Sequence, residues 1–143
     1  MEFRAGLAST LLVEDELYVI RAEGRVVWFQ LRTRPNTTPA RGAEVARAAG
    51  GYLLEHVLQR RSSWRGAVLD VREGPSVFGP ITLGITEQMF RKAEESRKPL
   101  CALVGRAPSQ RAQYEQLVSE LAPRFGKVAD TVAVVQDWMS DAG

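Results

Sequence analysis

Cysteine and histidine are scarce in this chain of 143 residues, which contains one of each. The single cysteine, Cys101, cannot form an intrachain disulfide, and its apolar neighbours indicate a small buried residue in a strand. The single histidine, His56, lies among leucine and valine residues, with no second histidine or spare cysteine to complete a metal site, so we expect it at the edge of the core. The sequence therefore predicts neither a metal centre nor a cofactor.

Long apolar runs and a strong charge of one sign are missing as well. No run approaches the ~20 residues that a membrane helix needs, so we expect no membrane span. Nineteen Lys and Arg nearly balance seventeen Asp and Glu, for a formal charge of +2, which gives no argument for nucleic-acid binding. The positive charges of Arg60, Arg61 and Arg65 cluster, and we interpret them as a solvated helix end. The opening MEFRAGLASTLLVEDE lacks the pattern of a secretory signal, which favours a cytoplasmic protein.

The motifs of common catalytic and phosphate-binding sites are absent. There is no G-x-S-x-G elbow for a nucleophile and neither G-x-x-x-x-G-K-[ST] nor G-x-G-x-x-G for a phosphate. A weaker pattern, Gly105 to Ser109, places Arg106 and Ser109 between a strand end and a helix start, where they could bind an anion. A plain connector is the favoured interpretation of that segment. We therefore expect a protein that is not an enzyme.

Composition and length fit one globular domain, with 45% apolar and 25% charged residues. We assign residues 1–14 to an N-terminal extension and residues 15–143 to the domain. Leu17 to Ala22 and Arg25 to Thr33 are rich in β-branched and aromatic residues, and Glu23-Gly24 between them predicts a tight hairpin.

Helical and strand patterns then alternate along the chain. An amphipathic helix begins near Pro39 and runs to Arg61, and Gly50-Gly51 within it indicates either a kink or a close backbone approach. Buried strands are predicted over Ala67–Val71 and Leu100–Gly105, and helices over Pro80–Lys98 and Pro108–Leu121.

The final segment allows two interpretations. The favoured one is a short strand over Phe125–Ala129 followed by a terminal helix that includes Trp138, and the alternative makes TVAVV the strand. With the first, the order is a β-hairpin followed by right-handed βα crossovers, which predicts an α/β fold with a single mixed, mostly parallel sheet and packed helices.

The stretch RGAVLDVREGPSVFGPITLG contains the strongest candidate site. Asp70 ends an apolar strand, two prolines and three glycines follow, and the hydroxyls of Ser76 and Thr82 lie at or before a helix start. Such hydroxyls are usually helix caps, although a phosphate there would be tolerated by the helix dipole and would change what can dock. The loop also presents Arg72, Glu73 and Phe78, and a pair formed by Asp70 and Glu73 is more typical of loop caps than of an acid and base.

Three stretches resemble the STAS domain, the fold of bacterial anti-sigma-factor antagonists, over roughly residues 15 to 140. They are GAVLDVREGPSVFGPITLG, RKPLCALVGRAPSQRAQYEQLVSELAP and DTVAVVQDWM. By this resemblance Asp70 matches the strand-terminal aspartate, Phe78 an apolar position before the helix, and Thr82 falls nearest the serine that is presented to a kinase. The family's D-S-S-G helix start is Gly79-Pro80-Ile81-Thr82 here.

The resemblance implies a non-enzymatic protein-interaction module in bacterial regulation. Its docking surface would run from Arg72 to Met89, its switch would be phosphorylation at Thr82 or Ser76, and its partner would be an anti-sigma factor or a regulatory kinase. The alternative is a binding domain for a small ligand, a nucleotide or an apolar metabolite or lipid, because Gly50-Gly51 and the mixed strand face around Trp28 leave room for one. That mixed face could instead form a homodimer contact or be covered by the amino-terminal segment.

Overall fold

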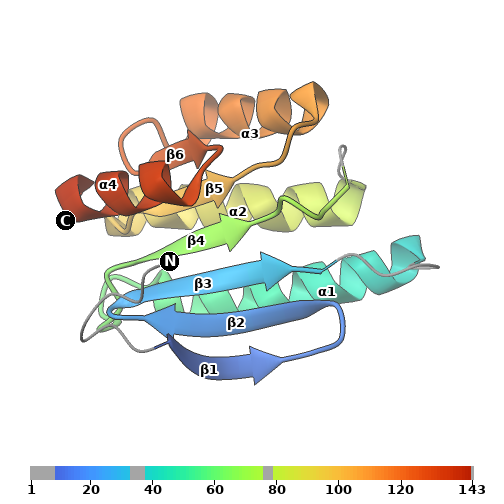
Figure 1. Cartoon of the computed structure of the whole chain (residues 1–143), viewed down its shortest axis with the longest axis horizontal. Coiled ribbons are helices and arrows are strands. Elements are labelled where there is room, and N and C mark those ends of the chain that lie inside the picture. Colours follow the sequence, from blue (N-terminus) through green and yellow to red (C-terminus); the bar gives the residue numbers. More distant parts are fainter. Residues whose placement is uncertain (1–8, 33–37, 76–78, 143) are drawn as a thin grey trace.

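The computed structural model describes residues 9–32, 38–75 and 79–142 of the chain. Three strands open the fold, and helices and strands then alternate (Figure 1). The strands are β1 (Ser9–Glu14), β2 (Tyr18–Glu23), β3 (Val26–Leu31), β4 (Gly66–Asp70), β5 (Leu100–Leu103) and β6 (Gly126–Ala129). The helices are α1 (Pro39–Tyr52), the π-helical turn η1 (Leu53–Val57), α2 (Pro80–Ser96), α3 (Pro108–Leu121) and α4 (Val132–Ala142).

The strands form one sheet whose spatial order follows the chain, from β1 to β6. The pairs β1–β2 and β2–β3 are antiparallel, and the pairs from β3 to β6 are parallel. This is the mixed α/β sheet that the sequence predicts, with one strand more: residues 9–14, which we assigned to an extension, form β1 and pair with β2. Because the strand order never reverses, the sheet lacks the switch-point crevice of doubly wound folds.

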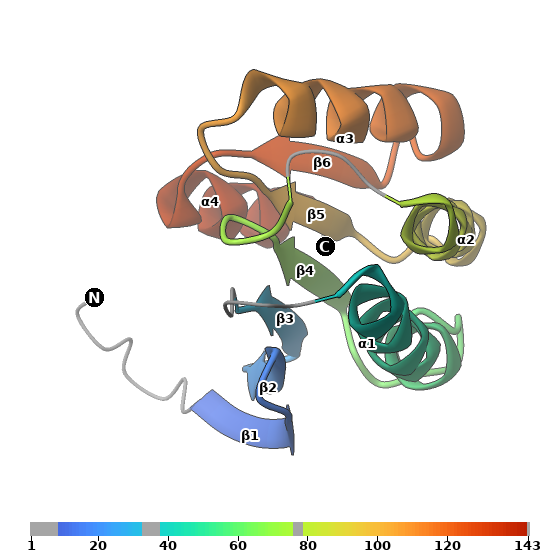
Figure 2. The ribbon, with the colours of Figure 1, turned by 90° about the vertical axis from the view of Figure 1, so that its right-hand side faces the viewer.

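Helices cover the two faces of the sheet unequally (Figure 2). The first three, α1, α2 and α3, lie on one face, and α4 lies on the other. Strand residues alternate between these faces, so Val27 and Phe29 join the core beneath α1 to α3, whereas Trp28 joins the core beneath α4. The two central strands β4 and β5 are buried along their whole length, as their continuous apolar runs predict.

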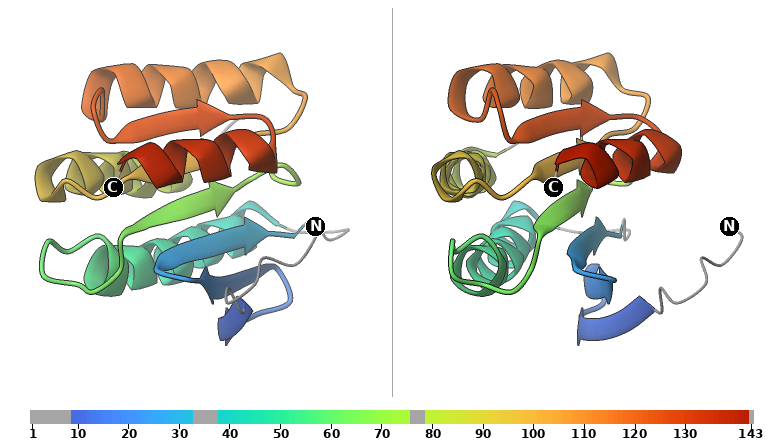
Figure 3. Two further views of the ribbon diagram at one scale, coloured as in Figure 1. Left: turned by 60° about the vertical axis from the view of Figure 1, so that its left-hand side comes forward. Right: turned by 90° about the vertical axis from the view of Figure 1, so that its left-hand side faces the viewer.

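On the α4 side, half of the sheet has no described helix above it. Figure 3 shows α4 in front of β5, while β1, β2 and β3 lie clear of it. Trp28 is nevertheless buried, with the Arg21 guanidinium 5.6 Å from its ring centroid, and Leu11 on β1 is 56% exposed. The homodimer contact predicted for this mixed face stays a prediction.

The helix α1 begins and packs for local reasons. The Thr38 hydroxyl accepts a hydrogen bond from Arg41 N at 3.1 Å, and Pro39 occupies the first turn, where its missing N–H costs nothing. Farther along, a Cβ at Gly50 would collide with Ile85 Cγ2 of α2, whereas a Cβ at Gly51 would meet open space. Gly50 is therefore a place of close approach, but by the side chain of Ile85 and not by backbone, as the sequence had suggested.

The expected single helix from Pro39 to Arg61 changes character after Tyr52. Leu53–Val57 form the π-helical turn η1, closed by a hydrogen bond from Leu58 N to Leu53 O at 2.8 Å. Leu53 and Val57 point into the core, which leaves His56 exposed, 5.0 Å from the Tyr52 ring. The prediction of a core-edge histidine was wrong, because the wider turn gives the buried positions to its apolar neighbours.

The terminal segment follows the favoured of its two interpretations. β6 spans Gly126–Ala129, and the TVAVV stretch leads into α4, whose first turn is capped by the Thr131 hydroxyl accepting from Val134 N at 3.2 Å. Cys101 lies in β5 and is fully buried, which raises the pKa of its thiol to about 12. The thiol is a core residue, as the sequence indicates.

Candidate functional site

The segment after β4 is organised by a buried carboxylate. Asp70 is 4% exposed and lies on the α4 side of the sheet, because it pairs in register with Leu103 of the core there. Its two oxygens accept from Arg72 Nε at 2.9 Å and from Arg72 Nη2 at 2.8 Å. These hydrogen bonds raise the pKa of the Arg72 guanidinium, although partial burial opposes the shift. Asp70 therefore holds Arg72 in place and is not itself presented to a partner.

Glu73 and Gly74 turn the chain toward the other face. Gly74 N donates to Val71 O at 2.9 Å, and a Cβ at Gly74 would lie 2.7 Å from Leu31 Cδ2. A larger residue at this position would therefore require the Leu31 side chain to shift. Glu73 is exposed and borders a cavity on the α1–α2 side. Asp70 thus lies on the α4 side of the sheet, whereas Glu73 borders the cavity on the other side.

Gln110 ties this segment to the next strand end and to α3. Its side chain is 3% exposed. Its amide oxygen accepts from Gly105 N at 2.8 Å, and its amide nitrogen donates to Val71 O at 2.8 Å and to Pro75 O at 3.3 Å. One side chain therefore connects the chain after β4 to the chain after β5. No interpretation of the sequence singled it out, although its place three residues after the N-cap Ala107 is that of a capping-box glutamine.

A cavity of about 770 Å³ lies between α1, α2 and the face of the sheet that α1, α2 and α3 cover. We call it the α1–α2 cavity. The side chains around it are mostly apolar, and most of the apolar ones come from the sheet, α1 and α2. They include Phe29, Leu31 and Leu69 from the sheet, Val45 from α1, and Ile85 and Met89 from α2.

A few polar groups interrupt the apolar wall. Thr82 and Thr86 border the cavity from α2, and the Thr86 hydroxyl donates to Thr82 O at 2.8 Å. Gln110 and Tyr114 border it from α3, and burial raises the pKa of the Tyr114 phenol, so that group stays protonated at neutral pH. The wall is thus apolar with a small set of neutral hydrogen-bonding groups.

The cavity opens at the carboxyl end of β4. The lining residues that are exposed to solvent lie together there, in the loop before α1, the loop after β4 and the start of α2. They are Thr38, Pro39, Glu73, Pro75 and Gly79. Arg32 is nearby, with its guanidinium 3.9 Å from the Glu14 carboxylate. Glu73, Pro75 and Gly79 of the predicted docking loop therefore also border the cavity where it opens.

The other predicted site residues have different placements. Thr82 is partly buried and borders the cavity, whereas Ser76 and Phe78 lie outside the described residues. Arg106 and Ser109, proposed for an anion site, are both exposed. The nearby Gly105 N–H, which such a site would use as a donor, already donates to Gln110. The anion site there stays a prediction without support from the hydrogen bonding.

Comparison with protein-family models, with curated proteins and with solved structures finds no match for this chain. Within residues 9–32, 38–75 and 79–142, no group of three or more His, Cys, Asp or Glu is arranged to hold a metal ion. None of the helices described is both long and apolar enough to cross a bilayer. The geometry around the α1–α2 cavity is therefore the basis for the proposed function.

Proposed function

We propose that the protein binds a small, largely apolar molecule, a metabolite or a lipid, in the α1–α2 cavity. The observation that carries this proposal is the cavity itself, whose volume of about 770 Å³ falls within the roughly 300–1,000 Å³ typical of small-molecule sites. The cavity is open to solvent at one end, and its wall is mostly apolar with a few polar groups. That combination is typical of small-molecule sites.

The lining favours an apolar ligand over a nucleotide. The groups around the interior are aliphatic and aromatic side chains with the neutral polar groups of Thr82, Thr86, Gln110 and Tyr114. The charged groups, Arg32 and Glu73, carry opposite signs and lie where the cavity opens. A polyphosphate would meet too little positive charge there to offset the loss of its hydration. An apolar chain would instead gain binding energy from the removal of its surface from water.

Two glycines of α1 allow a matched test. A Cβ at Gly42 or at Gly51 would meet open space, but only Gly42 borders the cavity. Replacing either glycine with leucine should raise helix stability by about 0.5–1 kcal/mol. Gly42→Leu should also fill the cavity, so the titration of a fluorescent fatty acid, cis-parinaric acid, should show at least ten-fold weaker binding than in the wild type.

Gly51→Leu is the control and should bind the probe as the wild type does. Saturable binding that is lost in Gly42→Leu and kept in Gly51→Leu would support the proposal. Binding that survives Gly42→Leu, or no saturable binding by the wild type, would contradict it. Circular dichroism on both variants separates loss of binding from loss of folding.

A second candidate is the protein-interaction module implied by the resemblance to STAS domains. The observation that favours it lies near the rim of the cavity: the Arg72 side chain after β4 is 43% exposed, and Ile81 at the start of α2 is 44% exposed. Arginine and exposed apolar side chains are residues that can anchor a protein partner. The partner would be an anti-sigma factor or a regulatory kinase in the cytoplasm.

Affinity capture from the native cell lysate tests this candidate. Ile81→Asp and Thr82→Glu alter the rim, whereas Val134→Asp alters another exposed apolar residue, on α4, that is 39% exposed. The interaction module predicts that an anti-sigma factor or kinase binds the wild type and Val134→Asp but neither rim variant. Equal capture by all of the variants would reject the rim as the docking surface.

A further inference from the structure

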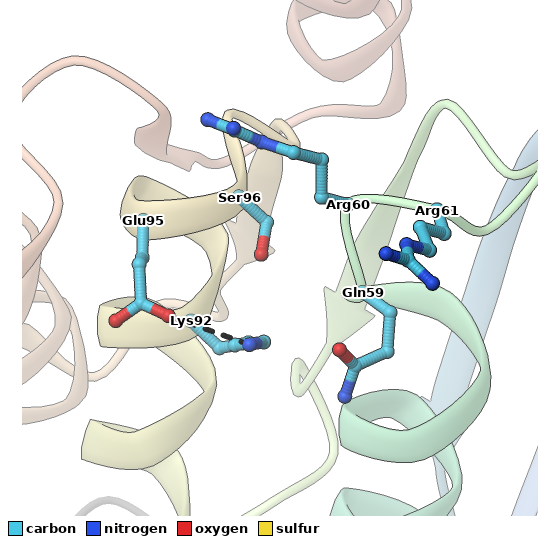
Figure 4. A pocket seen from close by; sticks show the side chains of 6 residues that line it. All are labelled: Gln59, Arg60, Arg61, Lys92, Glu95 and Ser96. Atoms are coloured by element: carbon cyan, nitrogen blue, oxygen red, sulfur yellow. Dashed lines mark hydrogen bonds and ion pairs between the residues drawn. The ribbon is translucent and has the colours of Figure 1, made fainter.

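A second cleft lies at the opposite end of the sheet from the α1–α2 cavity. It has a volume of about 580 Å³ and is bordered by the segment after η1 and by the last turns of α2. Figure 4 shows the side chains that face it: Gln59, Arg60 and Arg61 from the first segment, and Lys92, Glu95 and Ser96 from α2. We call it the basic cleft.

The charges around the basic cleft are unbalanced. Arg60, Arg61 and Lys92 are cationic, and Glu95 is the one acidic residue among the lining residues. Lys92 Nζ lies 3.4 Å from Glu95 Oε1, so that carboxylate is already engaged. Neither Arg60 nor Arg61 has an ion pair with another residue that the structure describes, whereas Arg41, Arg72, Arg111 and Arg124 each have at least one.

The backbone that carries the two arginines is held firmly. Lys98 Nζ donates to Ser62 O at 3.0 Å and also to Trp64 O, and the Ser62 hydroxyl donates to Val57 O at 2.6 Å. Burial, with the nearby charge of Arg25, lowers the pKa of Lys98. These bonds fasten the segment after η1 to the end of α2. The positions of Arg60 and Arg61 opposite Lys92 therefore follow from the fold.

Helix dipoles alone do not account for this cluster. Cations commonly gather at helix C-termini, where the partial charge is negative, and that explains Arg60 and Arg61 just after η1. It does not explain why cations from two helical segments, with no free acid opposite, border the same space. Like charges that border one space repel in the absence of a counterion, so an anion between them would relieve the repulsion.

We propose that the basic cleft binds a small soluble molecule with at least two phosphoryl groups. Planar guanidinium groups form paired hydrogen bonds with phosphate oxygens, and an ammonium group adds a compact charge. Arg60 and Arg61 would bind one phosphoryl group, and Lys92 would bind the next from α2. The Ser96 hydroxyl, which points into the cleft in Figure 4, would add a donor.

Calorimetric titration of the full chain with inorganic pyrophosphate tests this site. The double variant Arg60→Gln/Arg61→Gln should weaken binding at least ten-fold. The control is Arg47→Gln/Arg91→Gln, which changes the net charge equally at two exposed arginines that do not line the cleft. It should change the affinity less than two-fold. Thermal melting of both double variants should match the wild type, because all four side chains are exposed.

Three results would overturn the proposal. The first is no saturable pyrophosphate binding by the wild type at low ionic strength. The second is equal weakening in both double variants, which would indicate attraction to net charge alone. The third is tighter, cleft-dependent binding of phosphatidic acid vesicles or of a single-stranded oligonucleotide, which would assign the cleft to a membrane surface or to a nucleic acid.

Discussion

At the scale of single residues, the most consequential side chain is Gln110. It is buried, it satisfies one backbone donor and two backbone acceptors, and it borders the α1–α2 cavity. Replacing a buried amide in such a position is costly. The backbone groups that were its partners stay buried but lose their hydrogen bonds, so their desolvation is no longer compensated. Gln110 thus contributes both to the closure of the sheet's carboxyl edge and to the shape of the site.

Replacing Gln110 with leucine should lower the free energy of unfolding by about 1–3 kcal/mol. It should also loosen the segment around Pro75, since Gln110 Nε2 donates to Pro75 O. The control, on the same helix, is Gln116→Leu, because the side chain of Gln116 is exposed and donates to the exposed Glu120 carboxylate at 3.1 Å. Its effect should stay within about 0.5 kcal/mol. Urea denaturation measures both, and equal effects would refute the role given to Gln110.

At the scale of elements, the packing of α2 is set at two places by different means. In its N-terminal half, Gly50 of α1 lets Ile85 approach. Near its C-terminal end, Glu94 accepts from Arg124 Nε at 2.6 Å, from Phe125 N at 2.9 Å and from Arg124 N at 3.1 Å. Glu94 therefore fastens α2 to the turn that leads into β6.

Glu94→Ala should lower stability by about 1–3 kcal/mol, as expected for hydrogen bonds to a charged group. Burial of the Glu94 carboxyl opposes its ionisation, but the hydrogen bonds from Arg124 and Phe125 outweigh burial, and its pKa is lowered from 4.5. The stabilisation is therefore present above about pH 4.5 and is lost as the pH falls through the lowered pKa.

The control for this prediction is Glu95→Ala on the same turn. Glu95 is exposed and pairs with Lys92 only across the surface, so its loss should cost less than about 0.5 kcal/mol. Chemical denaturation at pH 7 and at pH 3 measures both variants against the wild type. A difference between wild type and Glu94→Ala that persists unchanged at pH 3 would contradict the role of the ionised carboxylate.

The elements also show how far local patterns reach. The hairpin, the buried strands β4 and β5 and the helix α2 follow from alternation, continuous apolar runs and helical spacing, which are properties of neighbouring residues. The strand β1 was missed because STLLVE carries little pattern of its own and is defined by its pairing with β2. The turn η1 was missed because its spacing resembles a helix until Leu58 bonds to Leu53.

At the scale of the whole molecule, the two ends of the sheet have different chemistry. The carboxyl end opens into the largely apolar α1–α2 cavity, and the opposite end borders the basic cleft. The sequence predicted a ligand space from Gly50-Gly51 and the strand face around Trp28. Gly50 does border the cavity, but Trp28 lies on the opposite face of the sheet, in the core beneath α4, so that part of the prediction was wrong. The sequence could not locate the basic cleft, because Lys92 lies more than thirty residues from Arg60 and meets it only through the fold.

The loop after β4 also unites the two functions that the sequence suggested. Glu73, Pro75 and Thr82 belong to the expected docking surface and at the same time border the cavity. Neither the volume of the cavity nor its lining could be read from a pattern, because they depend on how far α1 and α2 separate beyond their contact at Gly50. The geometry therefore favours ligand binding at the place where the resemblance implied partner binding.

The most direct test of ligand binding in the α1–α2 cavity is an NMR measurement of contacts between a bound fatty acid and methyl groups of the protein. Binding in the α1–α2 cavity predicts nuclear Overhauser effects from the ligand to Val45, Ile85 and Met89. It predicts none to Val135 or Met139, which lie in the separate core beneath α4. Contacts with the α4 core would contradict binding in the α1–α2 cavity. So would the absence of contacts to the cavity methyl groups at a saturating concentration of the fatty acid.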